Sequence, residues 1–310
     1  MISRRALLRG VGALVAGSVS LSGYAFGFEP FRLVETRYRL MPPNWPKGLR
    51  LKLAVIADIH ACEPWMTAGH IRGIVARTNA LKPDAILLLG DYVVAHKWIS
   101  GRVPAGEWAA ELAQLDAPLG VHAVLGNHDW WDDPIAQRRE HGPTAAQTAL
   151  QAAGLRVYEN DALRLEKDSQ AFWIAGLGDQ FAIRHGGAGG HYSKGVDDLA
   201  GTLARVKDDA PVILMAHEPD IFPKVPPRVA LTIAGHTHGG QIRVFGYIPN
   251  SYGRRERYSY GHFVERQSSR FPEAERNLIV SGGLGCSVLP IRLGVVPEIV
   301  VIELGGEEIV

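Results

Sequence analysis

Five short segments of the sequence place acidic, amide and imidazole side chains directly after apolar runs. They are Asp58-Ile59-His60, Gly90-Asp91, Gly126-Asn127-His128-Asp129, His217 and Gly235-His236-Thr237-His238-Gly239-Gly240. Carboxylate, amide and imidazole groups are ligands of divalent metal ions in proteins. An imidazole that is not a ligand can pass a proton, and a carboxylate beside it can hold it in one tautomer. The pattern therefore indicates a metal-assisted reaction.

The candidate ligands are too numerous for one tetrahedral zinc ion. With His128 left over, they comprise two carboxylates, one amide oxygen and four imidazoles: Asp58, His60, Asp91, Asn127, His217, His236 and His238. Such a set suits two divalent ions that share a carboxylate. Two dications against two carboxylates leave a positive site, which would attract a phosphate anion and lower the pKa of its own water. We expect a dinuclear centre.

The apolar runs before these segments predict buried strands that deliver the ligands. The runs lie at residues 51–57, 85–89, 121–125, 212–216 and 231–234. In open α/β sheets the carboxyl ends of strands converge on one crevice, so the ligands are expected to meet there. Helical spacing of apolar residues separates the early strands, at 71–81, 107–115 and 144–153, and a further helix is predicted at 197–206. The order predicts an α/β fold with mixed sheets.

Shorter strands are predicted elsewhere in the chain. The segment at 31–40 alternates loosely and is typical of a half-buried strand. Asn160-Asp161 separates the runs at 156–158 and 163–165 and predicts a hairpin turn between them. Further strands are predicted at 172–175, 241–244, 277–280 and 298–303.

The composition is that of an ordinary globular enzyme. Hydrophobic residues make up 46% and charged residues 21% of the chain, and a formal net charge of +1 argues against a dedicated nucleic-acid binder. The two cysteines, Cys62 and Cys286, exclude a disulfide scaffold and a cysteine-rich zinc module. We expect two unpaired thiols. Without a repeat or a low-complexity boundary, residues 29–310 are predicted to form a single catalytic domain.

The N-terminus carries a targeting pattern. Arg4 and Arg5 lie in Ser3-Arg4-Arg5-Ala6-Leu7-Leu8-Arg9, ahead of a weakly hydrophobic stretch from Val11 to Phe28. This predicts a twin-arginine export signal over residues 1–28. The Gly and Ser content argues against a stable membrane-spanning helix, and Ala25-Phe26-Gly27 offers a cleavage site. The expected location is the periplasm or cell envelope, with membrane attachment if the leader is kept.

The five segments, in order and complete, resemble the signature of the calcineurin-like metallophosphoesterase family. The twin arginines and the later segments resemble the exported bacterial branch of that family: His217-Glu218-Pro219-Asp220, Gly235 to Gln241, Gly283-Leu284-Gly285, Pro290-Ile291-Arg292 and Pro297-Glu298. The resemblance covers roughly residues 50 to 305. It implies a four-layer sandwich in which two mixed β-sheets are flanked by helices.

The resemblance also implies a role for each site residue. One metal would be held by Asp58, His60, His238 and the bridging Asp91. The second would be held by Asp91, Asn127, His217 and His236. His128 would contact the phosphate and protonate or stabilise the leaving oxygen, and Asp129 would orient His128. The two divalent ions would be Mn, Fe or Zn.

These features predict a metal-dependent phosphoesterase that cleaves a phosphodiester or phosphomonoester through a metal-bound hydroxide. Two alternatives stay open: a pyrophosphatase acting on nucleotide-linked lipid or sugar precursors of the envelope, and a non-catalytic envelope binding module. Trp130 and Trp131 fit either a substrate pocket or the core. The expected partners are a small-molecule or lipid-linked phosphate ester, the twin-arginine export machinery and the envelope or membrane surface. No dedicated nucleic-acid binding is expected, and the predicted state is a monomer.

Overall fold

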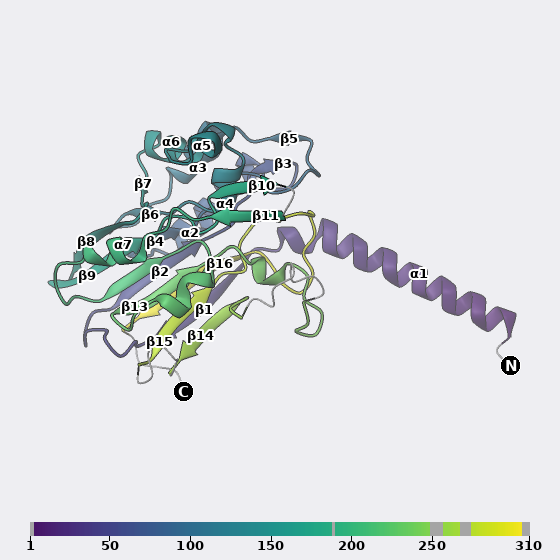
Figure 1. Cartoon of the computed structure of the whole chain (residues 1–310). Coiled ribbons are helices and arrows are strands. Elements are labelled where there is room, and N and C mark those ends of the chain that lie inside the picture. Colours follow the sequence, from purple (N-terminus) through teal and green to yellow (C-terminus); the bar gives the residue numbers. More distant parts are fainter. Residues whose placement is uncertain (1–2, 188–189, 249–256, 267–273, 306–310) are drawn as a thin grey trace.

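Two six-stranded mixed sheets form the centre of the protein (Figure 1). The computed structural model describes residues 3–187, 190–248, 257–266 and 274–305. The first sheet contains, in spatial order, β1 (Val34–Leu40), β16 (Glu298–Leu304), β2 (Leu51–Ile56), β4 (Ala85–Leu88), β6 (Val121–Ala123) and β7 (Arg156–Val157). The second contains β14 (Gly261–Glu265), β15 (Arg276–Val280), β13 (Val229–Ala234), β12 (Val212–Met215), β9 (Gln170–Gly176) and β8 (Asp161–Lys167).

The inner strands β2, β4, β12 and β13 are apolar on both faces because both faces of each sheet are covered there. On β2, Leu53 and Val55 pack in the core between the two sheets, together with residues of β12 and β13. Ala54 and Ile56, which alternate with them, pack in a second core under the helices. A third core lies on the outer face of the second sheet. The fold is therefore the predicted α/β sandwich of two mixed sheets flanked by helices.

The helices form the outer layers. Those over the first sheet are α2 (Ala68–Ala80), α3 (Ala105–Leu112) and α6 (Ala145–Ala152), while α7 (Leu199–Ala204) and the 3₁₀ helix η2 (Pro219–Lys224) cover the second. Thr67 caps α2 by accepting the N–H of His70, and Thr144 caps α6 in the same way. The four predicted helices all form.

Two predictions about loops and strands are wrong. Asn160 does not turn a hairpin, because β7 pairs with β6 in the first sheet while β8 pairs with β9 in the second. Its left-handed backbone (φ 56°) carries the chain from one sheet to the other. The hairpin turn lies instead at Asp168 and Ser169, both with positive φ, between β8 and β9. Residues 241–244 form only isolated bridges, from Ile242 to Leu293 and from Val244 to Tyr247.

Two small two-stranded sheets and several short helices lie outside the two large sheets. The small sheets pair β3 (Cys62–Glu63) with β5 (Gly101–Arg102) and β10 (Ile183–Gly187) with β11 (Gly190–Lys194). The helices are α4 (Asn127–Trp131), α5 (Pro134–Arg139) and η3 (His238–Gly240), and η1 (Glu29–Phe31) precedes β1. Cys62 and Cys286 are both buried and free, as expected.

The N-terminal segment forms one long helix, α1 (Arg4–Gly27), which projects away from the body (Figure 1). The Gly and Ser residues do not interrupt it, contrary to the expectation from composition. It is long and apolar enough to cross a membrane, a property that signal sequences share. The structure thus has an N-terminal apolar helix that fits either a signal or an anchor.

Candidate metal centre and active site

The segments that follow five strands bring the candidate ligands to one place. Asp58 and His60 follow β2, and Asp91 follows β4. Asn127 begins α4 soon after β6, and His217 follows β12. The histidines at 236 and 238 follow β13. Since β2, β4 and β6 run parallel, as do β12 and β13, the ligands gather at the carboxyl ends of both sheets.

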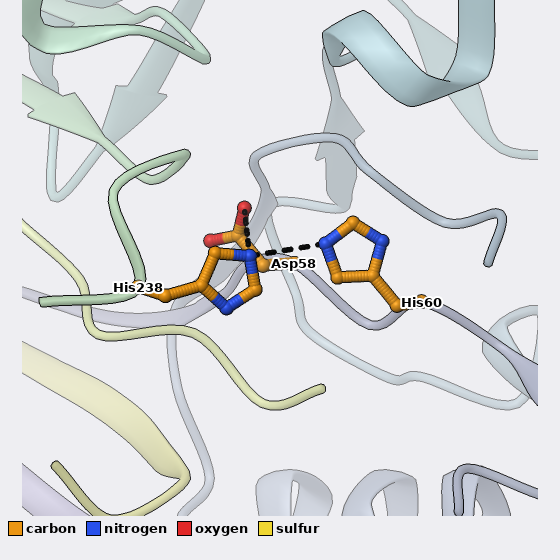
Figure 2. Close-up of side chains that lie close together, drawn as sticks. All are labelled: Asp58, His60 and His238. Atoms are coloured by element: carbon orange, nitrogen blue, oxygen red, sulfur yellow. Dashed lines mark hydrogen bonds and ion pairs between the residues drawn. The ribbon is translucent and has the colours of Figure 1, made fainter. Parts of the chain in front are cut away.

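Asp58, His60 and His238 form the first group, shown in Figure 2. The Nε2 atoms of His60 and His238 lie 3.1 Å apart. The Nε2 atom of His238 lies 3.8 Å from Oδ1 of Asp58. All three side chains are buried, and Figure 2 shows the carboxylate and the two ring nitrogens directed toward one another.

Asn127, His217 and His236 form the second group. The Oδ1 atom of Asn127 lies 2.8 Å from Nδ1 of His236 and 3.2 Å from Nε2 of His217. The two ring nitrogens are 3.3 Å apart. One amide oxygen and two ring nitrogens thus converge at a second point.

The carboxylate of Asp91 lies between the two groups. Its Oδ2 atom is 3.6 Å from Nε2 of His60 in the first group and 3.3 Å from Nε2 of His217 in the second. Its Oδ1 atom accepts the backbone N–H of His128 at 2.8 Å. Burial raises the pKa of Asp91, but the imidazole of His217, whose own pKa is raised by this carboxylate, outweighs burial and holds the pKa of Asp91 well below its usual range. An ionised carboxylate in this place can contact ligands of both groups.

Hydrogen bonds to backbone carbonyls fix the tautomers of two ligands. Nδ1 of His60 lies 2.8 Å from the carbonyl oxygen of Val93, and Nδ1 of His217 lies 2.7 Å from that of Leu89. A carbonyl oxygen only accepts, so each Nδ1 carries a proton, and in a neutral ring the lone pair lies on Nε2. Both Nε2 atoms face the Asp91 carboxylate, and imidazole nitrogens and carboxylate oxygens are ligands of divalent metal ions. The donor set therefore fits divalent metal ions.

Several of the ligands have a left-handed backbone. The φ angles are 54° for Asp58, 50° for His60, 56° for Asp91, 69° for His236 and 51° for His238. Residues with a Cβ atom adopt this conformation at a cost of about 1–2 kcal/mol each. At the end of a strand, this backbone conformation turns the side chain across the edge of the sheet.

Gly126 lets the loops after β4 and β6 approach each other closely. A Cβ atom at this position would lie 2.4 Å from Oδ1 of Asp91 and 2.6 Å from its backbone nitrogen. We expect Gly126→Ala to reduce the free energy of unfolding by about 1–3 kcal/mol, because the overlap must be relieved by moving Asp91. Thermal unfolding measures the loss, and calorimetric metal titration should show weaker binding.

Gly73→Ala provides the matched control for that substitution. Gly73 lies inside α2 and no atom lies within 4 Å of the added Cβ, so alanine should leave metal binding unchanged and raise stability by up to about 1 kcal/mol. Equal metal affinities in wild type and Gly126→Ala would contradict a role of this close approach in shaping the site.

In the described structure the Asp129 carboxylate bonds to the backbone of two loops and not to the ring of His128, and the orienting role implied by the resemblance stays a prediction. Its two carboxylate oxygens accept the backbone N–H groups of Asp91, Tyr92 and Gly126 at 2.9 Å each, and of Val93 at 3.3 Å. These donors belong to the loops after β4 and β6. Asp129 therefore ties together the two loops that carry Asp91 and Asn127.

His128 lies beside the ligands and outside both groups. Its ring meets the ring of His60 edge-on with centroids 5.3 Å apart, and its side chain is 17% exposed. Burial lowers the pKa of His128 to about 4, so the ring is neutral at neutral pH and keeps one N–H to donate. Trp131 lies 5.1 Å from this ring, whereas Trp130 is fully buried in the core.

Arg292 is a residue of the site that sequence patterns assigned no role. It is fully buried, and its guanidinium donates to the carbonyls of Gly282, Gly285 and Val295. Its Nη2 atom lies 3.3 Å from Nδ1 of His238. Burial, His60 and Arg292 together hold the pKa of His238 well below its usual range, so this ring is neutral, as a ligand must be.

A buried pair of carboxyl groups, Asp179 and Glu218, flanks the second group. Glu218 follows His217, and its carboxylate comes within 4.8 Å of ring nitrogens of His217 and His236. Burial, together with the nearby carboxyl of Glu218, raises the pKa of Asp179 well above its usual range. Asp179 follows β9 without any recognisable motif, so only the fold reveals it.

Comparison with known proteins gives one family. Residues 51–240 match the family model described as calcineurin-like phosphoesterase. An uncharacterized metallophosphoesterase of Bacillus subtilis, YkuE, is 29% identical and covers 98% of each chain. Phosphodiesterase YaeI of Escherichia coli is 28% identical over 98% of this chain and 100% of its own. The UDP-2,3-diacylglucosamine pyrophosphatase LpxG of Chlamydia muridarum is 25% identical over 88% of this chain and 90% of its own.

The family model covers more than half of the chain and spans all five of the segments that carry candidate ligands, from Asp58 to Gly240. The predicted resemblance to this family is thereby confirmed. The chain belongs to the calcineurin-like phosphoesterase family and is an enzyme that hydrolyses phosphate esters.

Proposed function

We propose that this protein is a phosphodiesterase with two divalent metal ions, held by the first and second groups and bridged by Asp91. The observation that carries the proposal is the position of the Asp91 carboxylate, within 3.6 Å of ligand nitrogens from both groups. A single ion would leave one of the two groups of candidate ligands without a partner.

The protein's own residues bind and orient the substrate around this centre. Two divalent ions, when bound, neutralise charge on the phosphate and acidify water. Asp91, Asn127 and the histidines of both groups would hold them. His128, neutral and partly exposed, would donate its N–H to the leaving oxygen. Asp129 holds the loops in register, and the half-buried Trp131 forms a wall beside His128.

The substrate class that we favour is a phosphodiester, because YaeI, which matches this chain end to end, is named a phosphodiesterase. A pyrophosphatase acting on a nucleotide-linked lipid is the second candidate, supported by the likeness to LpxG. The non-catalytic binding module is disfavoured because no ligand is missing from either group in the described structure.

We also propose export through the twin-arginine pathway, with Mn, Fe or Zn as the metals and a monomeric state. The paired arginines Arg4 and Arg5 lead an apolar helix, as such signals require. The family signature together with that leader supports the exported bacterial branch.

A matrix of metals and substrates tests the proposed function. Chelator-treated protein should show no hydrolysis, and Mn, Fe or Zn should restore it with two equivalents of ion, whereas Mg should restore less because imidazole ligands suit it poorly. Bis(p-nitrophenyl) phosphate should react faster than p-nitrophenyl phosphate, and nucleotide sugars should react slowly. Saturation of activity at one equivalent would overturn the dinuclear centre. No hydrolysis with any metal would favour the binding module.

A further inference from the structure

Helix α1 runs directly into the body, without a linker. Ala25, in its last turn, is buried, and its carbonyl accepts the backbone N–H of Arg292 at 3.0 Å. Phe28 ends α1 and begins η1, in which Glu29 and Pro30 are buried. The end of α1 is therefore in contact with the C-terminal loop that carries Arg292.

Most of the large apolar side chains exposed on the described body gather at this joint. They lie on the end of α1, on η1 and on three loops, and we call them the docking face: Phe26, Phe28, Phe31, Trp98, Val244, Phe245, Tyr247 and Val288. Phe245 is fully exposed, and Tyr247 is 70% and Trp98 63% exposed. The other exposed apolar residues of the body, Met41, Ile135 and Val264, belong to different elements. A gathering of this kind marks an interaction site.

Backbone contacts hold the three loops of the docking face together. Ala95 forms a bridge with Ser287, and Ile242 forms one with Leu293. The indole of Trp65 donates to the carbonyl of Trp98 at 2.7 Å. The same indole lies 6.3 Å from the ring of Phe26 and 6.2 Å from that of Phe31. The loop tips and the end of α1 therefore form one continuous surface.

The chemistry of this surface fits a phospholipid bilayer. The 24 residues of α1 extend about 36 Å, against about 30 Å for the hydrocarbon core of a bilayer. If Arg4, Arg5 and Arg9 mark one side of the membrane, the other interface falls near Tyr24 to Phe28. Aromatic side chains are favoured at that depth. Lys97 and Arg32, next to exposed aromatic residues, supply positive charge for lipid phosphates.

The docking face also borders the metal centre. Gln241, directly after η3, donates to the carbonyl of Leu289 and accepts the N–H of Ser287, so the loops of the face continue from His238. Arg292 links the end of α1 to the metal centre. Its backbone N–H donates to the carbonyl of Ala25, and its guanidinium lies 3.3 Å from Nδ1 of His238. Figure 1 shows α1 leaving the body beside these C-terminal loops, drawn in green and yellow.

We propose that the docking face rests on the bilayer surface and presents the metal centre to phosphate esters carried by membrane lipids. This inference rests on the proposed function for its substrate class. The membrane contact itself stands on α1, the contact of its last turn with the body and the exposed aromatic side chains.

A fluorescent label tests the contact without using activity. The full chain is reconstituted in phosphatidylcholine–phosphatidylglycerol vesicles, with an environment-sensitive dye on Phe245→Cys or, as control, on Ile135→Cys. The native cysteines are buried and leave labelling selective. The dye at 245 should shift to the blue and be quenched by lipids with a nitroxide in the headgroup region, and the dye at 135 should do neither. An unquenched label at 245 would overturn the proposal, and a blue shift without quenching would indicate contact with a second copy of the chain.

Hydrolysis distinguishes failure of this inference from failure of the proposed function. The double variant Phe245→Ser/Tyr247→Ser should hydrolyse phospholipid in vesicles at least about tenfold more slowly than wild type, because each lost aromatic contact weakens binding by about that factor. It should hydrolyse soluble bis(p-nitrophenyl) phosphate at the wild-type rate, as should Ile135→Ser with both substrates. If wild type cleaves the soluble diester but not phospholipid, the proposed lipid substrate is wrong and the proposed phosphodiesterase activity stands. Wild type that cleaves neither, with any metal, overturns the proposed function.

Discussion

Asp91→Asn is expected to lower the rate of phosphodiester hydrolysis by about 10³-fold or more and to reduce metal content by at least one ion per chain. An amide carries no charge to balance two dications, and it replaces a carboxylate that lies within 3.6 Å of candidate ligand nitrogens from both groups. Loss of the charge stabilisation that metal ions give a transition state corresponds to several kcal/mol. Rates with bis(p-nitrophenyl) phosphate and metal analysis by inductively coupled plasma mass spectrometry measure the two effects.

Asp84→Asn is the matched control, because Asp84 and Asp91 flank the same strand, β4. Asp84 accepts the backbone N–H of Lys52 at 2.7 Å and pairs with Lys167 at 2.6 Å, at the end of the sheet away from the ligands. Its replacement should affect stability alone. If Asp91→Asn kept two ions and the wild-type rate, the bridged centre would be wrong.

His128→Ala is expected to lower kcat by about 10²–10⁴-fold while leaving two ions bound. Its ring lies beside the ligands without belonging to either group, and general acid catalysis or hydrogen bonding to a leaving oxygen contributes a factor of that size. The rate loss should shrink for esters with a nitrophenol leaving group, which needs little stabilisation. Steady-state kinetics with good and poor leaving groups, alongside metal analysis, measure both.

His141→Ala serves as the control for that variant, since His141 is exposed and its ring bonds to the neighbouring carbonyl of Gly142. It should match wild type in rate and in metal content. Loss of a metal ion from His128→Ala would place this ring among the ligands and remove its role toward the leaving group.

The convergence of the candidate ligands could be predicted from sequence, because each one lies in a short polar segment that follows an apolar strand. The backbone contacts of Asp129 could not be predicted. His128 and Asp129 are consecutive residues of α4, and neighbours in a helix point about 100° apart, so the carboxylate points away from the imidazole beside it in sequence. It turns instead toward backbone N–H groups 36 to 38 residues away.

The other missed features also depend on distant partners. A short Asn-Asp turn has the same sequence whether the next strand pairs with the previous one or joins another sheet. After Asn160 the chain enters the other sheet. Arg292 lies 54 residues from the histidine it contacts, and Asp179 meets Glu218 only through the packing of β9 against β12. The continuity of α1 shows that glycines lower helix stability without breaking a helix.

The left-handed backbone at five ligands has a consequence for any effort to make this protein more heat-resistant. Glycine or asparagine adopts that conformation with little strain, so either would relieve it at Asp58, His60, Asp91, His236 or His238. Libraries ranked by thermal tolerance without added metal would therefore enrich variants that have lost a ligand. Directed evolution of this scaffold has to score hydrolysis and heat tolerance together, since at these positions the two are in conflict.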